Sequence, residues 1–497
     1  MREIFLQAKN ISKNFGGVAA LSGVDLTIHR GEVLCLAGEN GSGKSTLIKV
    51  ISGVHRADGG ELVIEGKRYA YLTPSESIKL GIQVIYQDFS IFPNLTVAEN
   101  IALNSEIREG RKFVNWKTVR RTALEAMDKI GVRIDPDLRV GRLSVANKQI
   151  VAICRALLND AKLIIMDEPT TALTAREVEH LFQTIKELKA RNIAVVIVNH
   201  KLEEVYGIAE NIAILRGGKS VAEGPIQSFD RTRFIQCMTG RSIAESPYCP
   251  DNANAPELFR VENLTLRGAF RDVSFSMRQG DIIGITGLLG SGRSEIGEAL
   301  FGMLPADSGS IVLGGSEIRI RSVSDAVRSG IAYVPEDRLT QGLFLPKSIG
   351  LNTVVSSLRA YRRRGVLNRA AMQRDMDRWV AELSINARDT ERAVQTLSGG
   401  NQQKVVLAKW INSAPRLLIL NQPTMGVDVG SKADIHDILK QLARSGMGVI
   451  IISDDLPELV ANCNRVLIMR RGRLDAVCEG GEVREDRIAA LITERAE

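Results

Sequence analysis

Nearly continuous apolar runs recur along the chain and alternate with stretches of helical spacing. The runs from Glu32 to Ala37, from Leu163 to Met166 and from Ile193 to Val198 have the composition of strands buried on both faces of a parallel sheet. After the first run, residues 45–51 place Leu, Ile and Val at the spacing of one helix face. This order of strands and helices predicts an α/β fold.

Two longer stretches have the pattern of amphipathic helices, one in each half of the chain. The apolar positions of the first are Trp116, Val119, Ala123, Ala126, Met127 and Ile130, and those of the second are Met372, Met376, Trp379, Val380 and Leu383. A stripe of this width is typical of a helix that packs on a core. We therefore predict a helical insert in each half, in which these side chains are buried.

The chain repeats itself once. Four pairs of segments match at a nearly constant offset: Gly287–Ser294 with the loop around Lys44 (293 − 44 = 249), Tyr333–Glu336 with Ile85–Gln87 (336 − 87 = 249), Leu397–Ser398 with Leu143–Ser144 (397 − 143 = 254) and Leu418–Thr424 with Ile164–Thr170 (418 − 164 = 254). The step in offset corresponds to a small insertion in the second copy. Such self-similarity indicates a duplicated domain.

The boundary between the copies is predicted in residues 246–256, which are rich in Pro and Asn and have no apolar period. The predicted domains are therefore 1–245 and 257–497, joined by the short linker 246–256. Each domain begins with a strand-like run, Phe5–Ala8 in the first and Leu258–Val261 in the second.

Composition narrows the class of protein only a little. A chain of 497 residues with 44% hydrophobic and 25% charged residues has the size and composition for two globular cores. No apolar run is long enough for a membrane span, and the N-terminus lacks the apolar segment of a secretion signal. The net charge of +7 permits contact with anionic lipid or nucleic acid but indicates neither. Six cysteines without CxxC spacing suggest reduced core residues of a cytosolic protein.

A phosphate-binding loop follows the first apolar run. Its residues fit G-x-x-x-x-G-K-[ST] and are Gly38, Glu39, Asn40, Gly41, Ser42, Gly43, Lys44, Ser45 and Thr46. Glycines let successive N–H groups point at phosphate oxygens, and the helix that follows adds its positive dipole end. Lys44 is expected to reach the β- and γ-phosphates, and the Ser45 hydroxyl is expected to bind Mg²⁺. A glycine turn with a chance Lys-Ser is the alternative.

Two acids, Asp167 and Glu168, end the apolar run that begins at Leu163. In P-loop ATPases the first acid of such a pair holds Mg²⁺ and the second polarises the attacking water. A strand that merely ends in a charged turn is the alternative, and the phosphate-binding loop upstream argues against it.

A glycine turn opens a predicted helix at Leu397-Ser-Gly-Gly-Asn-Gln-Gln403. The Ser398 hydroxyl and the backbone of Gly399 and Gly400 would form a second anion site, able to press on a γ-phosphate held elsewhere. The alternative is an ordinary helix start, because Ser is a good N-cap.

These motifs together resemble an ABC ATPase along essentially the whole chain. Gln87 matches the Q-loop and His200, which follows the run to Val198, matches the switch histidine. More narrowly, the chain resembles the tandem ATPase subunits of bacterial monosaccharide importers of the ribose, xylose and galactose group. That match lies in Gly287…Gly292-Arg293-Ser294, Tyr333-Val-Pro-Glu-Asp-Arg338, Leu397–Gln403 and Gly426-Val-Asp-Val-Gly430.

The resemblance implies two tandem P-loop domains, each a RecA-like core with a helical and an antiparallel β subdomain. In the family the two ATPase halves pack head to tail, and each ATP lies between the loop of one half and the signature of the other. The first site then combines the loop 38–46 and the first half's Gln87, Asp167, Glu168 and His200 with Ser398, Gly399, Gly400 and Asp428 of the second half. Catalytic roles fall to Glu168, His200 and Gln87, and Mg²⁺ ligation to Ser45, Gln87 and Asp167.

The second site is altered at nearly every element. Its positions are occupied by Gly287, Gly292, Arg293, Ser294, Glu336, Asn421, Gln422 and Asp454, with Ser144, Val145 and Ala146 as its signature and Thr174 at the position of Asp428. Asn421 removes a charge that Mg²⁺ binding needs, and Gln422 cannot act as a carboxylate base. Asn421 and Gln422 also depart from the family pattern, in which Asp-Glu is expected. We therefore expect this site to bind nucleotide poorly or to hold it without turnover.

The function implied is that of an ATP-hydrolysing subunit, with ATP and Mg²⁺, that drives uptake of a monosaccharide or similar solute. Implied partners are multi-span permease subunits, as a homodimer, and an extracytoplasmic sugar-binding protein, with two copies of this chain and no nucleic acid. The implied location is peripheral, on the cytoplasmic face of the inner membrane. A tandem ABC protein acting on ribosomes is the alternative, although that group has a long charged linker and two intact sites. A scaffold or regulator is disfavoured by the complete first site.

For two stretches the sequence allows two roles, either packing within the protein or contact with a partner or ligand. The stretch 88–96, with Phe89, Ile91 and Phe92, would meet a permease's coupling helix or pack the helical insert. Phe15 would stack on adenine or lie in the core.

Overall fold

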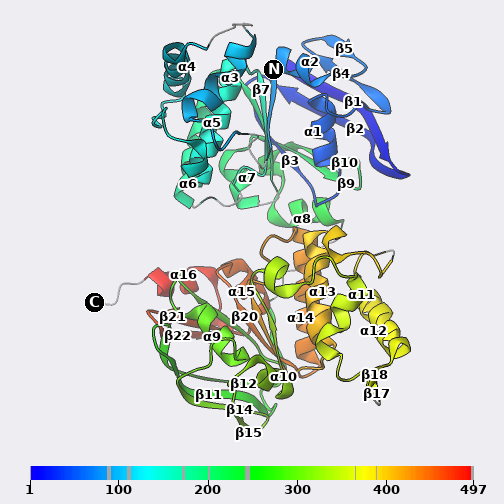
Figure 1. Cartoon of the computed structure of the whole chain (residues 1–497), viewed down its shortest axis with the longest axis vertical. Helices are drawn as coiled ribbons and strands as arrows, with labels where there is room; N and C mark the ends of the chain where they lie inside the picture. Colours follow the sequence, from blue (N-terminus) through cyan, green and yellow to red (C-terminus); the bar gives the residue numbers. More distant parts are fainter. Residues whose placement is uncertain are drawn as a thin grey trace. The chain divides into compact units, whose positions relative to one another are not determined.

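A computed structural model describes residues 2–86, 91–108, 114–170, 173, 175–199, 202–240, 247–363, 365–387 and 389–493. The chain divides into two compact units, 1–243 and 244–497, drawn in Figure 1 in blue to green and in green to red. Each contains one six-stranded and one four-stranded sheet with helices.

In the first unit the six-stranded sheet has the order β10-β9-β3-β8-β7-β6. Its strands are β3 (Val33–Ala37), β6 (Ile82–Ile85), β7 (Leu163–Asp167), β8 (Ala194–Val198), β9 (Asn211–Arg216) and β10 (Lys219–Pro225). All neighbours pair in parallel except β9 with β10, so β3, β6, β7 and β8 end at the same edge. The antiparallel sheet β2-β1-β4-β5 comprises β1 (Ile4–Phe15), β2 (Val18–His29), β4 (Gly59–Ile64) and β5 (Lys67–Tyr69).

Alternate residues of the parallel strands enter two separate cores. Val33, Ile164 and Val195 face the core formed with the helices of the insert, whereas Leu34 and Ile165 face α1 and the antiparallel sheet. The helices are α1 (Lys44–Ile51), α2 (Pro74–Lys79), α3 (Val97–Arg108), α4 (Trp116–Asp128), α5 (Val145–Leu158), α6 (Ala175–Ala190), α7 (Leu202–Ile208) and α8 (Arg231–Thr239). Burial on both faces explains why these strands are apolar at nearly every position.

The second unit repeats this topology. Its six-stranded sheet, β16-β19-β20-β13-β21-β22, comprises β13 (Ile282–Gly287), β16 (Ile331–Val334), β19 (Leu417–Asn421), β20 (Gly448–Ile452), β21 (Arg465–Arg470) and β22 (Arg473–Glu479). The antiparallel sheet β12-β11-β14-β15 comprises β11 (Glu257–Leu266), β12 (Phe270–Arg278), β14 (Ser308–Leu313) and β15 (Ser316–Ile318). The two strand orders correspond element by element, as the duplication predicts.

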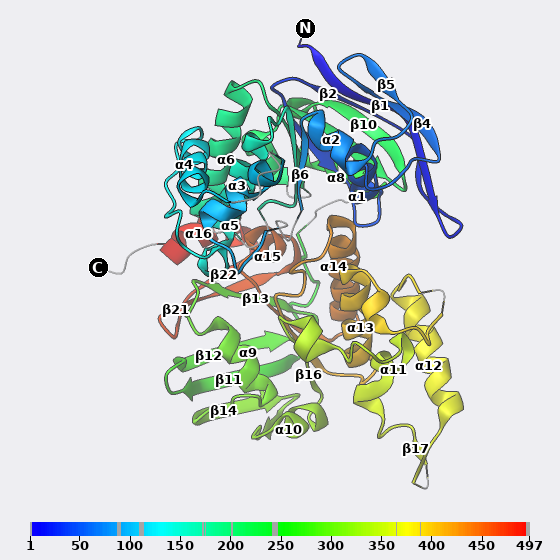
Figure 2. The same cartoon turned by 45° about the horizontal axis from the view of Figure 1, so that its top comes forward.

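The helices of the second unit are α9 (Arg293–Phe301), α10 (Val323–Arg328), α11 (Ile349–Val354), α12 (Arg369–Glu382), α13 (Gly399–Ile411), α14 (Val429–Arg444), α15 (Leu456–Asn462) and α16 (Glu485–Thr493). Figure 2 shows α11 and α12 on the side of α13 away from the antiparallel strands. A short hairpin, β17 (Arg362–Arg363) and β18 (Val366–Leu367), precedes α12. Each unit is thus an α/β core with a helical and an antiparallel β subdomain, as the sequence predicts.

The predicted apolar stripes are largely buried, with one clear error. In α4, Val119, Ala123 and Met127 are buried, but Trp116 is 61% exposed because it is the first residue of the helix, where its side chain has no turn to pack against. The stripe of α12 is confirmed at Met372 and Met376. Trp379 packs more loosely and donates its ring N–H to Asn412 at 2.8 Å.

The structure also bears on the cysteines and on the expected absence of a membrane span. All six cysteines are unpaired, and Cys35, Cys154, Cys463 and Cys478 are buried. Among the described residues no helix is long and apolar enough to cross a membrane. The predicted linker 246–256 remains a prediction, although Tyr248 within it is buried in the second unit and donates its hydroxyl to the carbonyl of Gly280 at 2.9 Å.

Lys409, inside α13, provides a stability prediction. Burial lowers the pKa of Lys409 from its ordinary 10.5 to about 8, and its ammonium group donates to the Gly342 carbonyl at 2.6 Å. Below pH 8 the amine is charged in both the folded and the unfolded chain, so the full cost of burying the charge, about 3 kcal/mol, is present. The cost disappears as the pH rises towards 10.5, because the folded chain releases this proton first.

We expect Lys409→Met to stabilise the chain at pH 7 by about 2 kcal/mol, since losing the hydrogen bond to Gly342 offsets about 1 kcal/mol of the gain. Denaturant unfolding of variant and wild type at pH 7 and at pH 10.5 checks this. The gain must shrink at the higher pH, and a gain that is equal at both would contradict the assigned cause.

Candidate active site

The phosphate-binding loop connects β3 to α1, in the predicted strand–loop–helix context. Gly38, Gly41 and Gly43 have φ of 151°, 79° and 104°, which side chains with a Cβ rarely adopt. A Cβ on Gly43 would also meet the Ala20 carbonyl at 2.6 Å. The loop therefore requires glycine at these positions for its shape.

Lys44 is the first residue of α1 and turns back over the loop. Its Nζ donates to the carbonyls of Gly38 at 2.7 Å and Glu39 at 2.8 Å. Ser45 and the adjacent loop residues Asn40 and Gly41 are exposed, so a ligand can reach the ammonium group and the Ser45 hydroxyl from outside.

Asp167 and Glu168 lie at the carboxyl edge of the same sheet, two strands from β3. Burial, and then the charge of Glu168, raise the pKa of Asp167, while Lys44 and Lys49 act in the opposite direction. Glu168 has a φ of 46° and donates its N–H to the Val198 carbonyl at 3.0 Å. A non-glycine residue at this φ stores strain, which the neighbouring strand β8 holds in place.

Gln87 and His200 lie outside the described residues. Their neighbours Tyr86 and Asn199 follow β6 and β8 directly, at the edge where β3 and β7 also end. Asn199 is buried and donates from its side chain to Glu204 at 2.8 Å. Thr174 also lies outside the described residues.

The first unit's donor groups fit a magnesium ion. Mg²⁺ prefers hard oxygen ligands and is held in nucleotide sites by one or two protein oxygens together with phosphates and water. The exposed Ser45 hydroxyl and the carboxylate of Asp167 are such oxygens, and a cation would relieve the charge that burial opposes at Asp167. No cluster of three or more His, Cys, Asp or Glu suited to a metal occurs in the described part of the chain.

The second unit's signature begins α13. Ser398 precedes its first turn, but its hydroxyl makes no capping bond and accepts from Asn401 Nδ2 at 2.9 Å. Ser398 is thus the N-cap residue of α13 by position, but its hydroxyl does not accept from a backbone N–H of the first turn. A Cβ on Gly400 would lie 2.1 Å from Ser431 Oγ, so that position has no room for a side chain. A Cβ on Gly399 would crowd the Arg338 guanidinium at 2.7 Å and the Gly426 carbonyl at 3.0 Å.

Asp428 begins α14 beside the signature. Its carboxylate accepts from the Ser431 N–H at 2.9 Å and from the Ser431 hydroxyl at 3.1 Å. The signature and the start of α14 thus form one tightly packed surface in the second unit.

Arg338 occupies a position that the sequence motifs do not predict. Its guanidinium donates to the carbonyls of Met425 at 2.7 Å and Gly426 at 3.3 Å and lies against Gly399. Arg338 is the last residue of the motif Tyr333–Arg338, so the sequence could have identified it as a functional residue. Its contact with a turn 87 residues away depends on the fold.

The second unit's own loop has the same backbone as the first. Gly287 and Gly292 have φ of 153° and 93°, and Gln422 has a φ of 50°, close to the values at the matching positions Gly38, Gly43 and Glu168. The backbone of the phosphate-binding loop is therefore the same in both units, and the side chains around it differ.

Three of the altered side chains, Arg293, Gln422 and Asp454, bind one another. Arg293 donates to the Gly287 carbonyl at 2.8 Å and forms an ion pair with Asp454 at 3.1 Å, and Gln422 Nε2 donates to Asp454 at 2.8 Å. Asn421 is buried, donates to the Tyr333 hydroxyl at 3.3 Å and leaves its side-chain oxygen without a partner. Three of the predicted substitutions, Arg293, Gln422 and Asp454, thus lie together, and Asn421 provides no carboxylate at the position that matches Asp167 of the first unit.

The charge beside the second loop is reversed as well. Thr46, Lys49 and Gln87 of the first unit carry a net +1, whereas Glu295, Glu298 and Glu336 at the matching positions carry −3. Burial, then the charges of Glu295 and Glu336, raise the pKa of Glu298, so these carboxylates interact. Their repulsion opposes binding of a polyphosphate.

The signature of the first unit is an ordinary helix start. Ser144 caps α5 by accepting from the Asn147 N–H at 3.3 Å, and Val145 and Ala146 follow where the second unit has glycines.

Comparison with known proteins defines the class. The ABC transporter family matches residues 21–171 and 270–425, once in each half. The chain therefore belongs to the ABC transporter family and is an ABC-type ATPase with two nucleotide-binding cassettes in tandem.

Its relatives match this chain over nearly their whole length. The ribose import ATP-binding protein RbsA 3 of Rubrobacter xylanophilus is 41% identical over 99% of this chain and 99% of its own. The ribose import ATP-binding protein RbsA of Geobacillus kaustophilus is 40% identical over 98% of this chain and 99% of its own. The crystal structure of a nucleotide-free ATP-binding cassette from an ABC transporter is 31% identical, with a TM-score of 0.41, over 45% of this chain and 91% of that cassette.

Proposed function

We propose that the chain hydrolyses ATP at one site only, the first site, and thereby drives import of a monosaccharide. The observation that carries this proposal is the contrast between the two sites: β7 ends in Asp167 with Glu168 next, whereas β19 ends in the uncharged Asn421 with Gln422 next. In the second site Arg293 also forms an ion pair with Asp454. The two sites have matching backbones and differ in their side chains. The difference therefore changes the chemistry of the second site and not its fold.

The loop 38–46 and the N-terminus of α1 bind the phosphates, with Lys44 turning from the loop carbonyls to the β- and γ-phosphates. Ser45, Asp167 and Gln87 would hold Mg²⁺, which neutralises charge that develops on the phosphoryl group. Glu168 orients and polarises the attacking water, and Gln87 and His200 complete the positioning.

The signature of the second half completes the first site. Ser398, Gly399 and Gly400 offer N–H groups and a hydroxyl at a helix N-terminus, the arrangement that favours a γ-phosphate, and Asp428 lies beside them. Binding across the two halves favours a closed state, and hydrolysis releases it.

The second site is proposed to bind nucleotide weakly and not to turn it over. The ion pair of Arg293 with Asp454, the three carboxylates beside the loop and the Cβ atoms of Val145 and Ala146 all oppose phosphate binding. Gln422 cannot activate water as a carboxylate does.

The solute is proposed to be ribose or a similar monosaccharide, because the relatives that match over the whole length carry ribose import in their names. The partners are then two multi-span permease subunits and an extracytoplasmic sugar-binding protein, with two copies of this chain at the cytoplasmic face of the inner membrane and no nucleic acid. The domain limits 1–245 and 257–497 remain part of this proposal.

The contact surface for a permease is proposed in 88–96, of which residues 88–90, with Phe89, lie outside the described residues. Phe92 is 52% exposed, so ordinary packing does not account for it, whereas Ile91 packs against the core of the helical insert. Phe15 is also exposed and lies edge-on to His55 at 5.2 Å, which excludes the core alternative and leaves adenine stacking as the proposal.

Affinity purification of the tagged chain from solubilised native membranes tests the function. The expected partner is a multi-span permease whose complex hydrolyses ATP in response to a sugar-loaded binding protein. Recovery of ribosomes in place of a permease would contradict import and support the alternative role in translation.

A further inference from the structure

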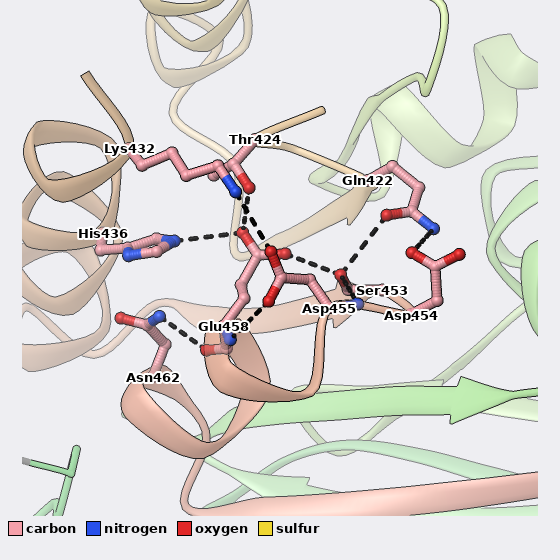
Figure 3. A network of polar contacts seen from close by, with 9 residues as sticks. All are labelled: Gln422, Thr424, Lys432, His436, Ser453, Asp454, Asp455, Glu458 and Asn462. Atoms are coloured by element: carbon pink, nitrogen blue, oxygen red, sulfur yellow. Dashed lines mark hydrogen bonds and ion pairs between the residues drawn. The ribbon is translucent and has the colours of Figure 1, made fainter. Parts of the chain in front are cut away.

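A buried carboxylate joins three separate elements of the second unit. Glu458 of α15 is 4% exposed, and its side chain accepts from the Thr424 hydroxyl at 2.8 Å and the Ser453 hydroxyl at 2.7 Å, and lies 3.1 Å from His436 Nε2 (Figure 3). Thr424 belongs to the turn after β19, Ser453 follows β20 and His436 lies on α14. One carboxylate therefore fixes the spacing of the turn, the strand end and the helix.

The turn and the helix that Glu458 holds both lead to the signature. Thr424 is followed by Met425 and Gly426, whose carbonyls Arg338 binds beside Gly399. His436 lies on α14, whose capping residue Asp428 and first-turn residue Ser431 pack against Gly400 without room for a Cβ. A shift of either element must therefore move the surface of Gly399, Gly400 and Asp428.

The same carboxylate exists in the first unit. Glu204 accepts from Thr170 and from Asn199 Nδ2, at positions offset by 254 from Glu458, Thr424 and Ser453 (458 − 204, 424 − 170, 453 − 199). In the second unit the neighbouring positions that face nucleotide have become Asn421, Gln422 and Asp454, while the threonine and the glutamate are present in both. If the network of Glu458 served only catalysis at the second site, it would have no function, because the catalytic side chains next to it are replaced.

We propose that Glu458 is a positioning residue for ATP hydrolysis at the first site, to which its own half contributes only the signature and Asp428. It acts through Thr424 and His436, which hold the turn and α14 against the signature. The proposal rests on the function proposed above, in which Ser398–Gly400 complete the loop of the other half.

The test is Glu458→Gln in the chain assembled with its permease. An amide has the shape of the carboxylate but one acceptor oxygen in place of two, so it cannot accept from Thr424, Ser453 and His436 together. We expect kcat for ATP to fall by about 10-fold, as expected of misplaced catalytic groups, while the Kd of ATP for the loop 38–46 stays within about twofold. Unchanged kcat, or a Kd that rises as much as kcat falls, would overturn the proposal.

Lys432→Met is the matched control. Lys432 forms an ion pair with Asp455 at 3.1 Å and so joins the same two helices, α14 and α15, but on their half-exposed side. Its loss is expected to leave kcat within about twofold of the wild type, because exposed ion pairs hold little energy. A loss as large as that of Glu458→Gln would show that any contact between these helices matters, which contradicts a specific role of the carboxylate.

A second pair of variants decides the matter if Glu458→Gln does not fold. Thr424→Val removes one donor at nearly constant volume, and Thr424→Ser restores the hydroxyl. Loss of kcat in the first and recovery in the second supports the proposal, and equal kcat in both overturns it. Ser398→Arg distinguishes a failure of the proposed function from a failure of the role proposed for Glu458. If Ser398→Arg leaves ATP turnover intact, the proposed function fails. If it abolishes turnover and Glu458→Gln does not affect kcat, only the role of Glu458 fails.

Discussion

Glu168→Gln is expected to abolish ATP turnover by the assembled transporter, whereas Arg293→Ala is expected to leave most of it. Glu168 directly follows Asp167, the last residue of β7, and is held at a φ of 46°. Its carboxylate is the group proposed to polarise the attacking water. An amide of the same shape cannot act as a base, and loss of such a group costs about 10² to 10⁴ in rate. Arg293 is the corresponding loop residue of the second site, but its charge is already bound to Asp454.

The measurement is steady-state ATP hydrolysis by the purified complex with each variant. Arg293→Ala also releases Asp454, so its folding is checked by thermal unfolding before its activity is compared. Equal loss of turnover in the two variants would mean that both sites hydrolyse ATP, which contradicts the proposal of one competent site.

Ser398→Arg is expected to be as damaging as Lys44→Ala, although the two residues lie in different halves of the chain. A bulky cation at the start of α13 would fill the space before Gly399 and Gly400, where added Cβ atoms would be crowded, and would keep a γ-phosphate from the helix N-terminus. Lys44→Ala removes the ammonium group that reaches the phosphates. We expect each to reduce turnover by at least about 100-fold.

Ser144→Arg is the matched control for Ser398→Arg. Ser144 has the same place in the first unit's signature, but it is a simple helix cap followed by Val145 and Ala146. We expect ATP hydrolysis to be kept, with a loss of stability of about 1 kcal/mol from the missing cap. Retained turnover in Ser398→Arg, or abolished turnover in Ser144→Arg, would contradict the head-to-tail arrangement of the two halves.

The fold follows from the sequence because its strongest signals are local. Buried parallel strands must be apolar on both faces, so the run Leu163–Met166 marks β7, and the repeat transfers each assignment to the second half. The error at Trp116 arises because helical periodicity says which face a residue lies on but not whether a neighbouring element covers the end of that face. The hairpin of Arg362–Arg363 with Val366–Leu367 has too few residues for any period to show.

The site is predictable to the extent that its residues form contiguous motifs. The loop 38–46 and the signature at Ser398 require particular residue types at fixed spacing, so sequence alone identifies them. The roles of Arg338 and Glu458 depend on contacts across 87 and 34 residues, which no local pattern encodes. Only the repeat carries a trace of Glu458, because Glu204 pairs with Thr170 at the same offset.

The central claim is that one of the two loops in each chain holds ATP for hydrolysis, and counting bound nucleotide tests it most directly. The Glu168→Gln complex is incubated with a photoreactive ATP and Mg²⁺, freed of unbound nucleotide and cross-linked, and the labelled peptides are identified. We predict one nucleotide per chain, with the label confined to peptides that contain residues 38–46 or 398–400. Two nucleotides per chain, or equal labelling of the loop 287–294, would contradict this account.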